Sequence, residues 1–220
     1  MTRQLALPFA GVARYRAADF LESEASAEAL AWLSRPELWP GLRLAVHGEA
    51  GSGKTHLLHV FAERHGALLM PGEAVRHLID LPAGGGIAVD DADTAPEPEA
   101  LLHLLNAAAE AGLPVLLAGR TPPARWNTAL PDLASRLRAI TPVALGHPND
   151  ELLRALLARL IADRQMRVEE SVQDFLLAHL PRQGAALREA VCCLDRLSLA
   201  AGRTVTRALA ACVVDKTNGL

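Results

Sequence analysis

The sequence predicts an α/β fold in which a five-stranded parallel sheet is flanked by helices and followed by a small helical domain. Short apolar runs alternate with helical patterns as far as residue 146, which is the pattern of strands and crossover helices in a parallel sheet. A glycine-rich stretch at residues 48–55 separates the first apolar run from a helical pattern. Beyond residue 149 only helical patterns remain, so we expect a second domain there.

The composition limits the classes of protein that fit this fold. The 220 residues are 50% hydrophobic and carry a formal net charge of -3, so the chain can bury a substantial core but has no general attraction for nucleic acid. No apolar run is long enough to span a membrane or to serve as a secretory leader. The cysteines Cys192, Cys193 and Cys212 follow no metal-binding spacing, which favours reduced core residues in a cytoplasmic protein.

The expected elements follow from the apolar runs and their spacing. Strands are expected at residues 42–47, 67–70, 87–91, 114–118 and 141–145. Helices are expected at residues 26–33, 56–65, 71–79, 96–112 and 130–137. After residue 147, three apolar faces and a last short helix at residues 204–214 form the helical domain.

The N-terminal stretch QLALPF leaves two interpretations open. Pro8 and the leucines favour an extended segment, which is either a frayed terminus or an edge strand. Alternatively, a glutamine followed by alternating apolar groups forms a linear peptide that docks into a hydrophobic pocket, with Gln4 fixing one end by hydrogen bonds.

The stretch GEAGSGKT at residues 48–55 matches the pattern G-x-x-x-x-G-K-[ST] between a strand and a helix, which predicts a phosphate-binding loop. Its glycines let the backbone N–H groups turn inward at a helix N-terminus. Lys54 supplies a positive charge for the phosphates, and the Thr55 hydroxyl a ligand for Mg²⁺. The predicted nucleotide-binding residues of this stretch are Gly48, Glu49, Ala50, Gly51, Ser52, Gly53, Lys54, Thr55 and His56.

A glycine-rich turn with a surface lysine is the structural alternative, but the use of basic residues argues against it. Lys54 and Lys216 are the only lysines among 22 basic residues, which suggests that the ammonium itself is needed in the loop. His56 and His59 have no partner at metal-binding spacing, so we expect His56 to abut the loop and His59 to pack on the helix.

A buried apolar strand ends in two carboxylates, Asp90 and Asp91. A magnesium–nucleotide site requires such carboxylates opposite its phosphate-binding loop. We expect Asp90 to hold the metal together with Thr55, and Asp91 to polarise the attacking water. An ordinary acidic turn is the alternative, since Asp93 follows closely. The predicted cofactors are ADP or ATP with Mg²⁺.

Together these parts resemble the AAA+ ATPases of the DnaA initiator class, and more closely the Hda group of DnaA-related regulators in proteobacteria. The resemblance covers nearly the whole chain: GKTHLLH at residues 53–59 resembles the P-loop helix, and VDD at residues 89–91 the Walker B strand. PDLASRL at residues 131–137 is similar to the arginine-finger segment, which implies that role for Arg136. LREAVCCLDRL at residues 187–197 resembles the lid helix that carries sensor 2, which implies a nucleotide contact for Arg188.

QLALPF resembles the sliding-clamp-binding peptide of the Hda group. The implied clamp-binding residues are Gln4, Leu5, Leu7, Pro8 and Phe9. The resemblance further implies a clamp-binding peptide at residues 1–12, an AAA+ domain at 13–146 and a lid at 147–220. Its arrangement also suggests adenine contacts near Phe20 and Leu21.

Two departures from the family pattern affect the expected chemistry. The sensor 1 region reads AGRTPP, which puts Arg120 and Thr121 where the family has an acid followed by arginine, so no sensor 1 residue is assigned. Asp91 is an aspartate where some Hda proteins have a neutral residue, so intrinsic hydrolysis stays open.

The resemblance implies a regulator that binds adenine nucleotide and the β sliding clamp of DNA polymerase, and that promotes hydrolysis of DnaA-bound ATP to prevent re-initiation. Such a chain is an activator more than a fast ATPase by itself, and a homo-oligomer is a further option. Two alternatives are an ATP-driven remodeller or helicase loader related to DnaC, and a passive adaptor with ADP as a structural plug. No helix-turn-helix domain of the DnaA kind follows, so we expect no direct sequence-specific DNA binding.

Overall fold

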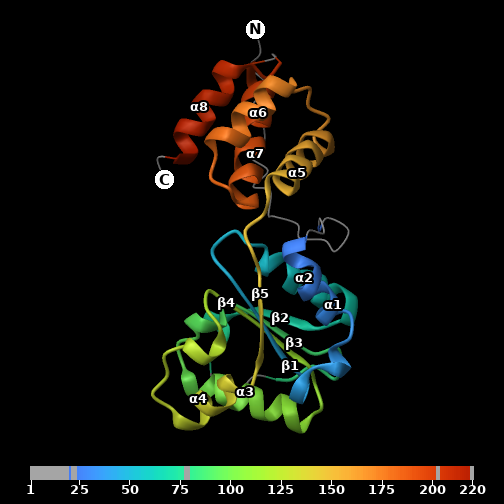
Figure 1. Cartoon of the computed structure of the whole chain (residues 1–220), viewed down its shortest axis with the longest axis vertical. Coiled ribbons are helices and arrows are strands. Elements are labelled where there is room, and N and C mark those ends of the chain that lie inside the picture. Colours follow the sequence, from blue (N-terminus) through green and yellow to red (C-terminus); the bar gives the residue numbers. More distant parts are fainter. Residues whose placement is uncertain (1–19, 21–23, 77–79, 202–203, 219–220) are drawn as a thin grey trace. The chain divides into compact units, whose positions relative to one another are not determined.

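The computed structural model describes residues 20, 24–76, 80–201 and 204–218. These residues belong to two compact units, one that ends at Gly146 and one that begins at His147 (Figure 1). The expected clamp-binding residues, Gln4 to Phe9, lie outside the described residues, as does Leu21.

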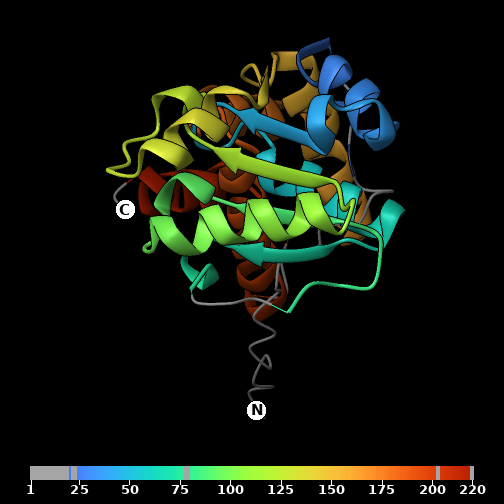
Figure 2. The same ribbon diagram turned by 90° about the horizontal axis from the view of Figure 1, so that it is seen from below.

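A five-stranded parallel sheet forms the centre of the first unit. Its strands are β1 (Arg43–His47), β2 (Leu68–Pro71), β3 (Ile87–Asp90), β4 (Val115–Gly119) and β5 (Thr141–Ala144). They lie in the order β2-β3-β4-β1-β5, and every pairing is parallel. The arrows that are visible in Figure 2 point in the same direction. The carboxyl ends of β1, β4 and β3 therefore meet at one edge of the sheet, where open α/β sheets bind their ligands.

Helices cover both faces of this sheet (Figure 1). The helices α1 (Glu24–Leu33) and α2 (Lys54–His65) pack on one face, and α3 (Pro98–Glu110) and α4 (Pro131–Arg138) on the other. Successive strand residues point to opposite faces of the sheet. Leu44 and Val46 therefore pack in the core under α1 and α2, and Ala45 packs in the core under α3 and α4. The connections contain the short turns η2 (Pro36–Leu38), η3 (Pro40–Leu42), η4 (Gly72–Ala74), η5 (Ala92–Thr94) and η6 (Pro123–Arg125).

The fold class predicted from the sequence is confirmed, with one clear difference in the elements. The helix expected at residues 71–79 is reduced, among the described residues, to the single turn η4. Gly72 packs so tightly on the turn after β3 that a Cβ atom would lie 2.2 Å from the Asp91 carbonyl oxygen. Val75 is fully buried in the core. These two contacts fix the segment against the sheet and end the helical turn early.

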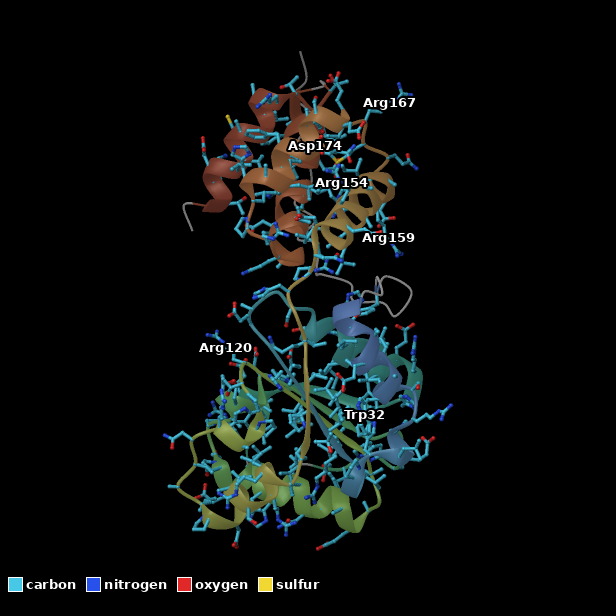
Figure 3. All side chains as sticks on the ribbon, viewed as in Figure 1. Trp32, Arg120, Arg154, Arg159, Arg167 and Asp174 are labelled. Carbon is cyan, nitrogen blue, oxygen red and sulfur yellow. The ribbon has the colours of Figure 1, made fainter. Side chains whose placement is uncertain are left out.

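The second unit consists, within its described part, of α5 (Asp150–Asp163), α6 (Glu170–His179), α7 (Gly184–Ala201) and α8 (Arg207–Asn218). Asn149 caps α5, because its side-chain oxygen accepts a hydrogen bond of 2.8 Å from the Leu152 N–H. An ion pair of 2.7 Å between Arg154 and Asp174 joins α5 to α6; both are labelled in Figure 3. The most deeply buried members of its core include Leu157, Leu176, Ala190 and Val191.

The expectation of core cysteines is wrong for Cys212. Cys192 and Cys193 are half-buried on α7, whereas Cys212 is exposed on α8. The reason is that α8 turns Val213 and Val214 into the core and leaves the opposite face to solvent. Among the helices that the structure describes, none combines the length and the apolar character needed to cross a membrane.

Candidate nucleotide-binding site

The loop between β1 and α2 has the geometry of an anion-binding loop. Gly51 and Gly53 have φ angles of 81° and 100°, a region in which other residues are strained. A Cβ atom on Gly48 would lie 2.6 Å from the Leu145 carbonyl oxygen, so a side chain there would push β5 away. The loop leads directly into the N-terminus of α2, whose first N–H groups have no partner within the helix.

Two polar groups inside the loop fit a phosphate ligand. The Lys54 ammonium donates hydrogen bonds to the carbonyl oxygens of Gly48, at 2.7 Å, and Glu49, at 2.9 Å, and the residue is only 7% exposed. The Ser52 hydroxyl oxygen is buried and has no hydrogen-bond partner among the described residues. A buried polar atom without a partner is costly, so a phosphate oxygen in this loop would satisfy it.

Opposing effects act on the charge of Lys54. Burial lowers the pKa of the ammonium from its ordinary value, and the positive charge of Arg120 lowers it further. The carboxylates of Asp91, Asp90 and Asp93 raise the same pKa. Lys54 therefore interacts both with the acids at the end of β3 and with Arg120, a cation to which the sequence analysis gave no role in the site.

Thr55 and Asp90, the predicted metal ligands, are in direct contact. The Thr55 hydroxyl donates a hydrogen bond of 2.7 Å to one carboxylate oxygen of Asp90, and the other oxygen accepts a bond of 3.1 Å from the Asp91 N–H. A hydroxyl and a carboxylate are ligands that Mg²⁺ uses together with water and phosphate oxygens. Within the described residues no group of three or more His, Cys, Asp or Glu side chains is arranged to hold a metal, so Mg²⁺ would depend on phosphate and water for its other ligands.

Asp91 lies at the strained turn that follows β3. Its φ and ψ angles are 48° and 44°, the left-handed region that only glycine adopts without cost. Burial raises the pKa of its carboxyl, as do the neighbouring charges of Asp90 and Asp93, while Lys54 and Arg120 oppose the shift. The turn holds a carboxylate of raised pKa beside the loop lysine, which is a suitable place for a group that polarises water.

Asp93 and Arg120 belong to the same site, although the sequence analysis gave neither a role. A carboxylate oxygen of Asp93 accepts a hydrogen bond of 2.8 Å from the Arg120 backbone N–H, which ties the loop after β4 to the turn after β3. Gly119 lets Trp126 close on this loop, because a Cβ there would lie 2.6 Å from the indole ring. Arg120 itself is exposed at the end of β4 and is labelled in Figure 3.

The remaining predicted nucleotide contacts lie on α2 and α7. His56 is 7% exposed and meets the ring of Phe20 edge to face, with 5.1 Å between the ring centres. His59 is half-buried on α2. Arg188 is half-buried on α7 in the second unit, and its contact with the phosphates stays a prediction.

Arg136, the predicted arginine finger, lies away from this loop. It is half-buried near the end of α4, and its positive charge acts on Arg43 at the start of β1. The predicted phosphate-binding loop follows the other end of β1. The structure therefore brings Lys54, Thr55, Asp90 and Asp91 together and leaves Arg136 outside their site.

Comparison with known proteins finds matches to the second unit and to the fold. Residues 150–210 match the family model of the Hda lid domain. An uncharacterised protein of Haemophilus influenzae is 28% identical over 176 residues, which are 73% of this chain and 76% of that protein.

Solved structures share the fold. Domain III of the Thermotoga maritima replication initiation protein DnaA gives a TM-score of 0.74 at 18% identity, covering 92% of this chain and 96% of the domain. The AMPPCP-bound DnaA of Aquifex aeolicus gives 0.66 at 16% identity, covering 86% of this chain and 67% of that one. A Thermotoga maritima RuvB variant gives 0.69 at 16% identity, covering 94% of this chain and 74% of its own. The chain is therefore similar to the Hda lid domain over residues 150–210, and it shares its fold with domain III of DnaA.

Proposed function

We propose that this chain binds an adenine nucleotide with Mg²⁺ at the loop of residues 48–55 and regulates replication initiation by promoting hydrolysis of ATP bound to DnaA. It does so when attached to the DNA polymerase sliding clamp through Gln4, Leu5, Leu7, Pro8 and Phe9. The Hda-type lid and the DnaA-like fold support a DnaA-related regulator. Arg188 on the lid contacts the chain's own phosphates in this proposal.

The position of Arg136 carries the proposal. Its charge acts on Arg43, whereas the phosphate-binding loop starts after His47, at the far end of β1. At about 3.3 Å per strand residue, these two ends of β1 are roughly 13 Å apart. A guanidinium at this edge is poorly placed for its own nucleotide, which supports a role toward the nucleotide of a neighbouring subunit.

An alternative role for Arg136 is an ordinary ion pair with Asp132 on the same helix. Among the described residues, Arg136 forms no hydrogen bond or ion pair through its side chain. A guanidinium that meets a neighbouring γ-phosphoryl group stabilises the charge that spreads over its oxygens in the transition state, an effect worth about 10³–10⁵ in rate. Within the described part of the chain, Arg136 is therefore available for that contact.

A stand-alone ATPase, such as a remodeller or helicase loader, is the second candidate. Asp91 favours it, because the raised pKa of its carboxyl and its place beside Lys54 suit a group that positions the attacking water. This candidate predicts ATP turnover by the chain alone, without DnaA.

ATP turnover measured with the chain alone, with DnaA, and with DnaA plus clamp loaded on DNA separates these functions. We expect slow turnover by the chain alone and strong stimulation of DnaA in the full mixture. Arg136→Ala should lose the stimulation and keep nucleotide and clamp binding. Arg138→Ala, an exposed arginine on the same helix, is the matched control and should stimulate normally. Full stimulation by the Arg136→Ala protein would rule out the trans-acting arginine.

A further inference from the structure

Arg43 lies beside α3, at the edge of the sheet where the strands begin. It is the first residue of β1 and is half-buried. Its guanidinium donates a hydrogen bond of 3.0 Å to the Leu105 carbonyl oxygen in α3. That bond fixes the position of the guanidinium, because Leu105 is itself fully buried in the core between α3, α4 and the sheet.

Arg136 reaches the same edge from α4. The pairing of Leu44 with Thr141 sets the start of β1 level with the residues that precede β5, and α4 ends only three residues before β5. Leu133 and Leu137 of α4 pack in the same core as Leu105, so the helix that carries Arg136 lies against the part of α3 that Arg43 contacts. Burial lowers the pKa of the Arg43 guanidinium, and the positive charge of Arg136 lowers it further.

The pair has no counter-ion in the described part of the chain. Neither Arg43 nor Arg136 forms an ion pair with a described carboxylate. A half-buried cation next to a second cation is unfavourable unless an anion neutralises both. A pair of arginines kept in this state suits an anion that comes from outside the chain.

We propose that Arg43 and Arg136 form a two-guanidinium anion site whose ligand is the polyphosphate of a nucleotide bound by a neighbouring AAA+ subunit. This rests on the proposed function, in which Arg136 serves such a nucleotide. Arg43, fixed by Leu105, is the static member, and Arg136, whose side chain has no hydrogen bond in the described structure, is the adjustable one. The planar guanidinium forks match the oxygens of phosphate groups in a way that lysine does not.

Substitution of Arg43 in the full-length protein tests this site. Arg43→Met removes the charge and keeps an unbranched chain, and Arg43→Lys keeps the charge without the fork. Hydrolysis of DnaA-bound ATP is measured in the presence of clamp loaded on DNA, over a range of DnaA concentrations. For Arg43→Met we expect the rate at saturation to fall at least about tenfold, with half-saturation unchanged. The rate at saturation for Arg43→Lys should lie between those of Arg43→Met and the wild type, and the rate for Arg138→Met should match the wild type.

A melting curve shows whether Arg43 has only a structural role. Because Arg43→Met removes a poorly compensated charge, its melting temperature should equal or exceed that of the wild type. A melting temperature lowered by several degrees would make Arg43 a structural residue and overturn the proposal.

The kinetic outcomes separate this inference from the function on which it rests. A normal rate for Arg43→Met combined with a lost rate for Arg136→Ala would overturn the paired site and leave the proposed function standing. A raised half-saturation with an unchanged rate at saturation would show that the pair holds a protein carboxylate, which also overturns it. Normal rates for both variants would remove the proposed function itself.

Discussion

Single residues of the loop are arranged around one buried ammonium. Lys54 is held by the carbonyl oxygens of Gly48 and Glu49. Asp90 at the end of β3, with Asp91 and Asp93 after it, raises the pKa of Lys54 against the effects of burial and Arg120. Carbonyl oxygens are weaker partners for an ammonium than phosphate oxygens. When a nucleotide binds in the loop, the Lys54 ammonium is therefore already positioned, and phosphate oxygens would replace the carbonyl oxygens as its hydrogen-bond acceptors.

Lys54→Ala should accordingly remove the stabilisation that a nucleotide provides. A ligand at about 100 times its Kd stabilises the folded state by about 2.7 kcal/mol, which is a shift of several degrees in the melting temperature. The measurement is thermal unfolding with and without magnesium and ADP. Lys216→Ala changes the chain's other lysine, which is exposed on α8, and should keep the full shift. Equal shifts in both variants would contradict the assignment of the site.

Among the elements, the turn between β3 and η5 stores strain beside the site. The Asp91 carbonyl oxygen accepts a bond of 2.7 Å from the Thr94 hydroxyl and one of 2.9 Å from the Thr94 N–H, and Gly72 packs against the same carbonyl. These contacts hold Asp91 in the left-handed conformation. The fold thus keeps Asp91 in a strained conformation next to Asp90 and Asp93, which suggests a functional role for its carboxylate.

Asp91→Asn tests the raised pKa of this carboxyl through the pH dependence of stability. Burial and the charges of Asp90 and Asp93 raise the folded-state pKa of the Asp91 carboxyl above its ordinary value of 3.8. A carboxyl whose pKa is raised by folding binds its proton more tightly in the folded state than in the unfolded state. Its ionisation therefore destabilises the fold as the pH rises through the folded-state pKa. The variant should therefore melt higher than the wild type at pH ~7.

The advantage of Asp91→Asn should shrink as the pH falls through the raised folded-state pKa and below the ordinary value of 3.8, because the wild-type carboxyl then becomes protonated as well. A constant part can persist, because asparagine tolerates the left-handed conformation well. Melting curves across this pH range provide the check, with Asp132→Asn as a control at an exposed acid on α4. A difference that grows on acidification would contradict the raised pKa.

The elements themselves were largely predictable from the sequence, and the order of the strands was not. Alternation of apolar runs with helical spacing placed all five strands to within a few residues, because each strand is a short apolar run bounded by turn residues, even where β2 and β5 at the sheet edges are only partly buried. The order β2-β3-β4-β1-β5 depends on long-range pairing, so the sequence could not show that β4 lies between β1 and β3. For that reason the place of Arg120 beside Lys54 and Asp91 was missed.

Arg43 was missed for a related reason. It stands at the start of a strand whose other end carries the obvious motif, and nothing local distinguishes it from other arginines. Its relation to Arg136 depends on the parallel pairing of β1 with β5 and on the packing of α3 against α4. Contacts between segments this far apart along the chain appear only once the tertiary structure is known.

At the scale of the whole molecule, the proposed function divides among three parts of the chain. The unit that ends at Gly146 holds the predicted nucleotide loop and Arg136, and the unit that begins at His147 contains the residues that match the Hda lid model. The proposed attachment to the sliding clamp depends on Gln4 to Phe9, outside the described residues. If clamp binding belongs to a separate linear peptide, then it should be separable from folding and from nucleotide binding.

Changing Gln4, Leu5 and Phe9 together to alanine should abolish clamp binding and leave the rest of the protein intact. Truncating an anchor residue of an interface costs about 2 kcal/mol or more, and a peptide of micromolar affinity has only about 8 kcal/mol to lose, so three truncations leave no measurable complex. Co-elution with the clamp gives the readout, and Arg3→Ala is the flanking control. Melting temperature and ADP affinity should stay at wild-type values, because a linear peptide contributes little to a domain core. Retained co-elution, or a markedly lower melting temperature, would instead make QLALPF an ordinary structural segment.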